Sequence, residues 1–213
     1  MATTNLDQTT DAIVDAFGEL IGLKSRELES HCKRVTAFTI ALARTMRISG
    51  EQFRGITQGT FLHDVGMIGV PDSILFKPSA LTAEEFSCVR EHCLHGYEIV
   101  RKVPFLEEAA EIVYAHEERY DGSGYPRGLR GQEILLGARI FSVAHALDAI
   151  TSERPYRVAR SMAAARDEIA NLAGEQFDPQ VVRAFLTMPD SLWESLRREV
   201  DSPLRGRFTA TAY

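Results

Sequence analysis

The sequence predicts an all-α protein, a helical bundle that encloses a buried metal site. Two observations carry this prediction. Apolar residues recur three and four positions apart in one segment after another, as on one face of a helix, and no stretch shows the alternation of a strand. Five of the six histidines fall on those apolar faces. With 213 residues, 45% hydrophobic and 25% charged, the chain has the length and composition of a globular domain with a sizeable core.

Two helices are expected first, over residues 10–22 and 25–46. His31 lies on the apolar stripe of the second helix, and Glu27 is one turn earlier on nearly the same face, so both side chains can serve one site. The apolar stripe of the first helix can pair with a second copy of the chain, giving a homodimer, or pack on the chain's own core.

A third helix is expected after Ser49, a residue type that caps helix N-termini, and its apolar face ends on His63 beside Asp64. Adjacent helical residues point about 100° apart. The two side chains can therefore flank one metal ion, or two ions that share the carboxylate. Gly66 and Gly69 are expected to close this helix.

A capping box of Thr82 and Glu85 predicts a helix of about twenty residues. His92 belongs to its inward face, whereas His95 lies further round and is expected on the surface. The other inward residues of this helix are expected to be Phe86, Val89, Cys93, Gly96 and Val100.

Pro104 is expected to open the next helix, which ends on His116. Residues 136–152 form another, with His145 and Asp148 three positions apart on one face.

The segment Asp121-Gly-Ser-Gly-Tyr-Pro126 interrupts regular structure with a turn-rich loop that can approach a ligand closely. Asp178 and Pro179 cap a further helix, and residues 190–200 form the last one.

Burying an imidazole without a partner costs roughly 1–3 kcal/mol, so five such residues would consume much of a marginal folding free energy. Shared ligation of one or two cations satisfies all five at once. The carboxylates of Glu27, Asp64 and Glu117 supply the charge that a divalent pair requires. The inward histidines are His31, His63, His92, His116 and His145.

The three cysteines, Cys32, Cys88 and Cys93, include no Cys-x-x-Cys pair. We therefore expect nitrogen and oxygen ligands, which favour iron, manganese, zinc or magnesium. Two ions a few Å apart typically activate water for attack on phosphorus, and Arg154 and Arg157 are placed to contact phosphate.

The composition excludes other classes. A net charge of −6 argues against a broad basic surface for polynucleotides. No apolar run approaches about 18 residues, and the first ten residues lack the basic start and apolar core of a leader. We expect a cytoplasmic protein that binds neither membranes nor polynucleotides.

At these residues the chain resembles the HD-GYP domains, a branch of the HD phosphohydrolase superfamily that degrades the bacterial second messenger cyclic di-GMP. The resemblance runs from about residue 24 to residue 186. Its anchors are His63-Asp64-Val-Gly66 and residues 68–75, 116–126 and 151–157, and the unbroken Asp121-Gly-Ser-Gly-Tyr-Pro126 is highly specific.

The resemblance implies an HD-type helical bundle with two or three divalent metal ions, iron or manganese, and a cyclic dinucleotide as substrate. His63 and Asp64 match the signature pair, Tyr125 matches the named tyrosine, and Arg154 and Arg157 match the residues that hold the phosphates. The other positions that match family ligands are Glu27, His31, His92 and His116.

Three residues depart from the family pattern. Met67 stands where the family has a lysine near the substrate phosphate, so charge stabilisation is lost there. Glu117 replaces a histidine and His145 replaces an aspartate. Both replacements still offer groups that bind a first-row divalent ion. We expect the site to keep metal, with altered geometry, metal preference or activity.

Three functions remain open at this point. The first is a metal-dependent phosphodiesterase that opens cyclic di-GMP to the linear dinucleotide and onward to GMP. The second is a catalytically weak or silent module that binds the nucleotide or a partner, such as a diguanylate cyclase or another signalling domain, through the loop at Tyr125. The third is hydrolysis of another phosphoester. Residues 1–23 are predicted to be a helical lead-in, 24–200 the HD-GYP-like domain and 201–213 a loose tail.

Overall fold

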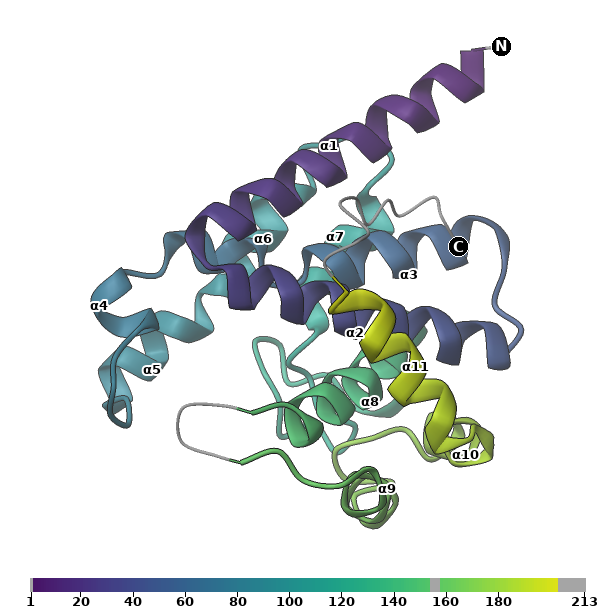
Figure 1. The fold of residues 1–213 in the computed structure, drawn as a ribbon. Coiled ribbons are helices and arrows are strands. Elements are labelled where there is room, and N and C mark those ends of the chain that lie inside the picture. The colour runs from purple at the N-terminus through teal and green to yellow at the C-terminus, as the bar shows by residue number, and fades with distance from the viewer. Residues whose placement is uncertain (1, 154–157, 203–213) are drawn as a thin grey trace.

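The computed structural model describes residues 2–153 and 158–202, and in these ranges the chain is helical with no named strand (Figure 1). This confirms the all-α prediction. The helices are α1 (Ala2–Lys24), α2 (Arg26–Thr45), α3 (Gly50–Leu62), the 3-10 helix η1 (Val65–Gly69), α4 (Asp72–Leu75), α5 (Ala83–Arg90), α6 (His92–Val100), α7 (Glu107–Ala115), the 3-10 helix η2 (Gly131–Glu133), α8 (Leu136–Thr151), α9 (Met162–Asn171), α10 (Pro179–Thr187) and α11 (Asp190–Val200).

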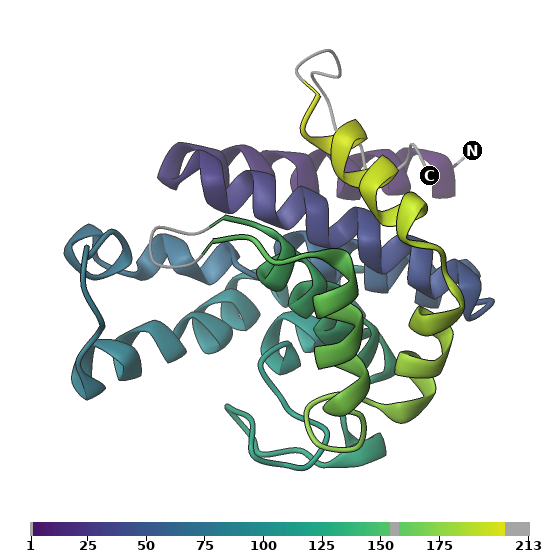
Figure 2. The same cartoon turned by 60° about the horizontal axis from the view of Figure 1, so that its bottom comes forward.

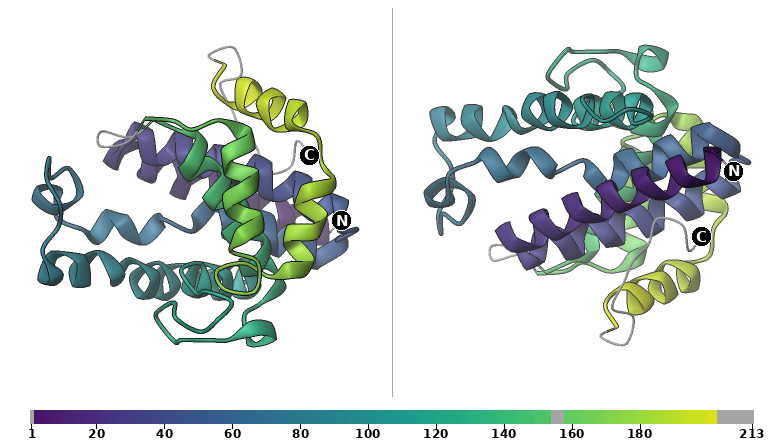
Figure 3. Two further views of the ribbon diagram at one scale, coloured as in Figure 1. Left: turned by 90° about the horizontal axis from the view of Figure 1, so that it is seen from below. Right: turned by 90° about the horizontal axis from the view of Figure 1, so that it is seen from above.

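Helix α2 is the central element of the bundle. It packs against α1, α3, α8, α10 and α11, and the turned views show it between α1 on one side and α8 and α11 on the other (Figures 2 and 3). Ser25 starts it, because the Ser25 hydroxyl accepts a hydrogen bond of 3.3 Å from the Leu28 amide. Of the helices described, none is both long and apolar enough to cross a membrane.

The two larger hydrophobic clusters fill most of the interior. The first joins α2 with α8, α10 and α11, and its largest side chains are Phe38, Phe141 and Trp193. The second joins α1 with η1, α6 and α7, and it buries Val14 and Ile21 of α1. The stripe of α1 therefore packs on the chain's own core. The homodimer and the division of the chain at residue 23 stay predictions.

Two expected features between residues 82 and 106 are wrong. The helix that begins with the Thr82 capping box is broken at Glu91 into α5 and α6, and Phe86 is 48% exposed instead of inward. Helix α7 begins at Glu107 rather than at Pro104. The physical reason lies at Phe105, whose φ of 71° belongs to the left-handed region, so no right-handed helix can pass through it.

Of the capping residues predicted at the starts of α10 and α3, one makes the expected hydrogen bond and the other does not. Asp178 caps α10 as expected, its carboxylate accepting a 2.7 Å hydrogen bond from the Gln180 amide. Ser49 precedes α3 but its side chain makes no capping hydrogen bond. Helix α9 was not predicted, because it buries only Ala165 and Ile169 and so carries a weak apolar stripe.

A close backbone approach holds η1 against α6. The nearest atom to a Cβ built at Gly66 would be the His92 carbonyl oxygen, 2.0 Å away, followed by the Gly96 nitrogen at 2.7 Å. Only glycine fits at this point. The contact brings His63 and Asp64, which directly precede η1, close to His92, the first residue of α6.

We expect Gly66→Ala to lower the free energy of unfolding by about 1–3 kcal/mol, because the backbones of η1 and α6 must move apart. Denaturant unfolding followed by circular dichroism measures this change. The matched control is Gly69→Ala in the same 3-10 helix, where the nearest atom to a Cβ is His95 Nδ1 at 3.4 Å. Equal losses in the two variants would contradict the packing argument.

Candidate metal centre

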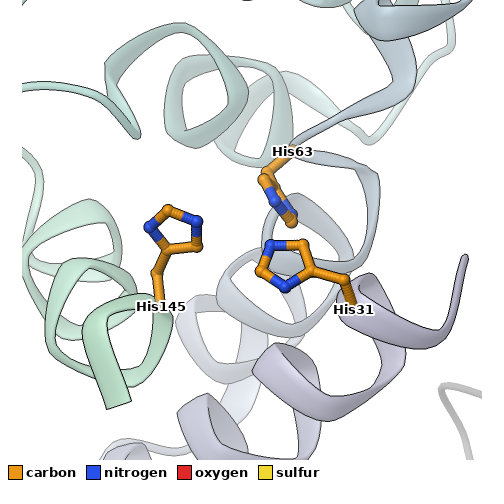
Figure 4. Close-up of side chains that lie close together, drawn as sticks. All are labelled: His31, His63 and His145. Carbon is orange, nitrogen blue, oxygen red and sulfur yellow. The ribbon is translucent and has the colours of Figure 1, made fainter. Parts of the chain in front are cut away.

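Five histidines from five helices meet in the interior, and His31, His63 and His145 form the first group (Figure 4). Their ring centroids lie 5.3 Å apart for His31 and His63, 5.1 Å for His31 and His145, and 5.9 Å for His63 and His145. His31 comes from α2, His63 from the end of α3 and His145 from α8. One ring nitrogen of each lies within 4.8 Å of the others.

The second group consists of His92, the first residue of α6, and His116, which follows α7. Their Nε2 atoms are 2.9 Å apart. Asp64 lies between the groups, with Oδ2 3.2 Å from His63 Nε2 and Oδ1 3.6 Å from His92 Nε2. The two oxygens of the Asp64 carboxylate thus face both groups.

Backbone carbonyls orient three of these rings. In each case Nδ1 contacts the carbonyl three residues earlier, and a carbonyl oxygen can only accept, so the hydrogen sits on Nδ1. The Nε2 lone pair of the neutral ring then faces the centre. The pairs are His63 Nδ1 with Thr60 O at 2.8 Å, His92 Nδ1 with Val89 O at 2.6 Å, and His116 Nδ1 with Val113 O at 2.7 Å.

A carboxylate orients the fourth ring. His31 Nδ1 lies 2.7 Å from Asp148 Oδ2, and Arg34 Nε donates to Asp148 Oδ1 at 2.8 Å. Burial opposes the charge on Asp148, but the hydrogen bonds from His31 and Arg34 outweigh it and hold the pKa of this carboxyl well below its usual range. An ionised Asp148 fixes the hydrogen on Nδ1 and turns Nε2 away from itself, as in carboxylate–histidine–metal arrangements.

The Asp64 carboxylate and the His63 imidazole shift each other's pKa. Burial lowers the pKa of His63, but the Asp64 carboxylate more than compensates and raises it well above the usual value. The pKa of Asp64 is correspondingly held well below its usual range by His63 despite burial. Burial, with His92 and His63 nearby, keeps the pKa of His116 well below its usual value. The carboxylate therefore attracts one positive charge, which a metal ion supplies in place of a proton.

The residues fit a divalent metal. His63 Nε2 is buried and has no hydrogen-bond partner among the described residues, since its approach to Asp64 lacks hydrogen-bonding geometry. The Nε2 atoms of His92 and His116 face each other although both Nδ1 hydrogens already have acceptors. A buried lone pair without a partner, as on His63, is costly, and a cation that also replaces the contact between the Nε2 atoms of His92 and His116 satisfies all three nitrogens.

Phe141 of α8 packs beneath these rings. It stacks on His145 with the ring centroids 5.2 Å apart. Its centroid is 4.8 Å from that of His63 and 5.5 Å from that of His116. Cys32 interacts with His63 from the second hydrophobic cluster. The centre therefore lies where the two clusters meet, and packed apolar groups hold the imidazoles in place.

Two cavities flank the centre. The larger, of about 330 Å³, is lined in part by Glu27, His31 and Met67, and the smaller, of about 180 Å³, lies beside Tyr125. Glu117 and His145 line both. Two of the three side chains that depart from the family pattern thus face both cavities, and the third, Met67, faces the larger one.

The loop at residues 121–126 is shaped by the acidic pair before it. The buried Glu118 carboxylate accepts hydrogen bonds from the amides of Arg127 at 2.8 Å and Leu129 at 3.0 Å. Burial raises the pKa of Tyr125, and the Glu117 carboxylate raises it further, so the phenol stays protonated and donates to Glu117. Arg90 of α5 lies over the Tyr125 ring, 4.1 Å from its centroid.

The predicted site residues are not all equally central. Glu27 is 76% exposed at its side chain and accepts from Arg34 at 3.1 Å, so it stands at the rim of the larger cavity. Glu117 Oε1 is 4.0 Å from His116 Nε2. His95 is exposed, as expected. Arg154 and Arg157 lie outside the described residues.

Three residues that position or approach the centre were not among the predicted site residues. Arg34 and Arg197 both contact Asp148, and Arg34 lies on the same face of α2 as His31, a spacing that could have identified it. Cys93 also lies at the centre, although the absence of a Cys-x-x-Cys pair argued against thiol ligands.

An all-helical bundle with a buried centre of histidines and a shared carboxylate defines a class of metal-site proteins. Within that class, the chain belongs to the HD domain family, whose model matches residues 15–181. The resemblance to HD-GYP domains read from the sequence is confirmed.

Two named relatives and one solved structure agree with this family. A cyclic di-GMP phosphodiesterase of Thermotoga maritima is 38% identical over 191 residues, which cover 89% of this chain and 52% of that protein. The 3'3'-cGAMP-specific phosphodiesterase 3 of Vibrio cholerae is 38% identical over 153 residues, which cover 72% of this chain and 33% of that protein. The chain spans about half the length of the first and a third of the second.

The crystal structure of a cyclic GMP-AMP specific phosphodiesterase of V. cholerae has a TM-score of 0.66 to this chain at 19% identity, covering 89% of this chain and 52% of that one. It shows that the two share a fold.

We expect Asp148→Asn to weaken metal binding by roughly 10–100-fold, because His31 loses the carboxylate that fixes its ring. It should also lower the free energy of unfolding by about 3–5 kcal/mol, since buried Arg34 loses its partner. The depressed pKa makes this stabilisation present above the unfolded carboxyl pKa of about 4 and declining as the pH falls below it.

Competition titration against a metal-binding dye and denaturant unfolding measure the two effects. Glu98→Gln is the matched control, because Glu98 forms an exposed ion pair with Arg101 at 3.4 Å and should change neither quantity appreciably. Unchanged metal affinity in Asp148→Asn would show that Asp148 acts on stability alone.

Proposed function

We propose that this chain is a metal-dependent phosphodiesterase that opens cyclic di-GMP to the linear dinucleotide and onward to GMP. The observation that carries the proposal is the Asp64 carboxylate placed between two groups of inward-facing imidazoles beside an open cavity. The relative named a cyclic di-GMP phosphodiesterase, 38% identical over 89% of this chain, supports the substrate.

The proposed cofactor is a set of two or three divalent ions, iron or manganese. Bound ions would lower the pKa of a water molecule and neutralise charge on the phosphoryl oxygens. His63 and Asp64 contact each other where the two groups meet, since the His63 ring centroid is also 5.2 Å from that of His116, and both are proposed as catalytic. The residues proposed to hold the ions are Glu27, His31, His63, Asp64, His92, His116, Glu117 and His145.

The remaining proposed roles concern the substrate. Tyr125, held by Glu117 on one side and Arg90 on the other, presents a fixed ring at the smaller cavity. Such a ring offers a stacking surface for a base. Arg154 and Arg157 are proposed to bind phosphates, since planar guanidinium groups bind phosphate in a bidentate manner.

A second candidate is a silent nucleotide-binding module, and Met67 favours it. The Met67 side chain lines the larger cavity together with Asp64, at the position where the resemblance leads us to expect a lysine. The thioether of Met67 supplies no positive charge to a phosphoryl group. Phosphodiester hydrolysis in this cavity would therefore lack one source of electrostatic stabilisation of the transition state.

The test of the proposal is turnover of cyclic di-GMP, followed by separation of the nucleotides, with iron or manganese supplied under reducing conditions. We expect the linear dinucleotide to appear with the wild-type protein and to vanish with Asp64→Ala. Glu98→Gln, distant from the centre, should keep full activity. Binding of cyclic di-GMP without any product would contradict the enzyme and support the silent module.

Met67→Lys measures the cost of the missing charge. If loss of the lysine limits an otherwise working site, we expect kcat to rise by at least tenfold while metal content stays the same. Met67→Leu, which conserves volume without charge, is the control and should leave kcat near the wild-type value. An equal rate in Met67→Lys and Met67→Leu would show that the loss of charge at residue 67 does not set the rate.

A further inference from the structure

A thiol lies beside the second group of histidines. Cys93 is fully buried, and its Sγ atom is 3.6 Å from His92 Nε2, the ring nitrogen that faces the centre. His116 Nε2 is 2.9 Å from the same nitrogen. The three atoms Cys93 Sγ, His92 Nε2 and His116 Nε2 all lie within 4.8 Å of one another and are buried.

These separations suit ligands of one ion. With metal–sulfur and metal–nitrogen bonds of about 2.3 and 2.0–2.1 Å, a tetrahedral angle puts sulfur and nitrogen roughly 3.6 Å apart. Two nitrogens at the same angle would be about 3.3 Å apart. The observed sulfur–nitrogen distance of 3.6 Å matches the tetrahedral value, and the nitrogen–nitrogen distance of 2.9 Å would widen by about 0.4 Å on binding one tetrahedral ion.

An independent observation also points to a cation here. The Nδ1 hydrogens of His92 and His116 are both donated to backbone carbonyls, so the two Nε2 lone pairs face each other. A positive ion between them removes this repulsion, and Cys93 Sγ lies at its edge. Cys88, by contrast, lies half-buried on α5, outside these clusters.

We propose that Cys93 is a metal ligand of this chain, completing with His92 and His116 a site of mixed sulfur and nitrogen donors. As the sulfur–metal bond forms, the thiol proton passes to solvent, so no oxidant or reductant is involved. The inference rests on the metal centre proposed above and is independent of the substrate.

One consequence concerns the choice of metal. Thiolate ligands favour zinc or iron over manganese and magnesium, which prefer oxygen donors. The second group of histidines should therefore prefer zinc or iron. A thiol ligand in this group departs from the expectation of nitrogen and oxygen ligands throughout.

The test is anaerobic titration of metal-free protein with cobalt(II), followed by absorption spectroscopy. A cobalt–thiolate bond produces an intense near-ultraviolet charge-transfer band, whereas nitrogen and oxygen ligands give only weak visible bands. We expect the charge-transfer band in the wild-type protein, in Cys88→Ala and in Cys32→Ala, whose thiol lies near His63 and Asp64 instead.

Cys93→Ala should lose the charge-transfer band, keep the weak visible bands, and bind the ion of the second group at least tenfold more weakly. The wild-type spectrum decides the question even if this variant fails to fold: visible bands without a charge-transfer band overturn the proposal. Loss of the band in Cys32→Ala but not in Cys93→Ala also overturns it. Absence of any cobalt spectrum would refute the metal centre itself.

Discussion

The structure depends on where the Nδ1 hydrogens of its buried histidines go. His63, His92 and His116 give theirs to backbone carbonyls, and His31 gives its own to Asp148. Each of these bonds leaves an Nε2 lone pair facing the interior, beside the carboxylate of Asp64. Such an arrangement is costly without a cation and favourable with one. Metal binding should therefore also raise the stability of the fold.

The scaffold serves this arrangement by placing helix ends at the centre. His63 follows the last residue of α3, His92 is the first residue of α6, and His116 follows α7. Gly66 lets the backbone after Asp64 approach α6 closely enough for the two groups to meet. At the opposite side, Arg197 of α11 hydrogen-bonds to Asp148, so the C-terminal helix helps to hold the residue that orients His31.

Periodicity predicted the helical class and the inward direction of five histidines because burial follows a regular spacing. It misplaced the start of α7, since the left-handed backbone of Phe105 leaves no mark on an apolar stripe. It also could not show that Arg34 pairs with Asp148 or that Cys93 lies near His116, because these partners come from segments distant in sequence. Ligand motifs read along the chain detect spacing, whereas this centre is made by helices that meet only in the folded protein.

The most direct test of the metal centre is elemental analysis of the purified protein after reconstitution with iron or manganese under reducing conditions. Asp64→Ala should be measured beside it, because that carboxylate faces both groups of histidines. The account requires about two bound ions per chain in the wild-type protein, and fewer in the variant. A wild-type metal content near zero would contradict it and would leave the buried imidazoles to be explained by hydrogen bonding alone.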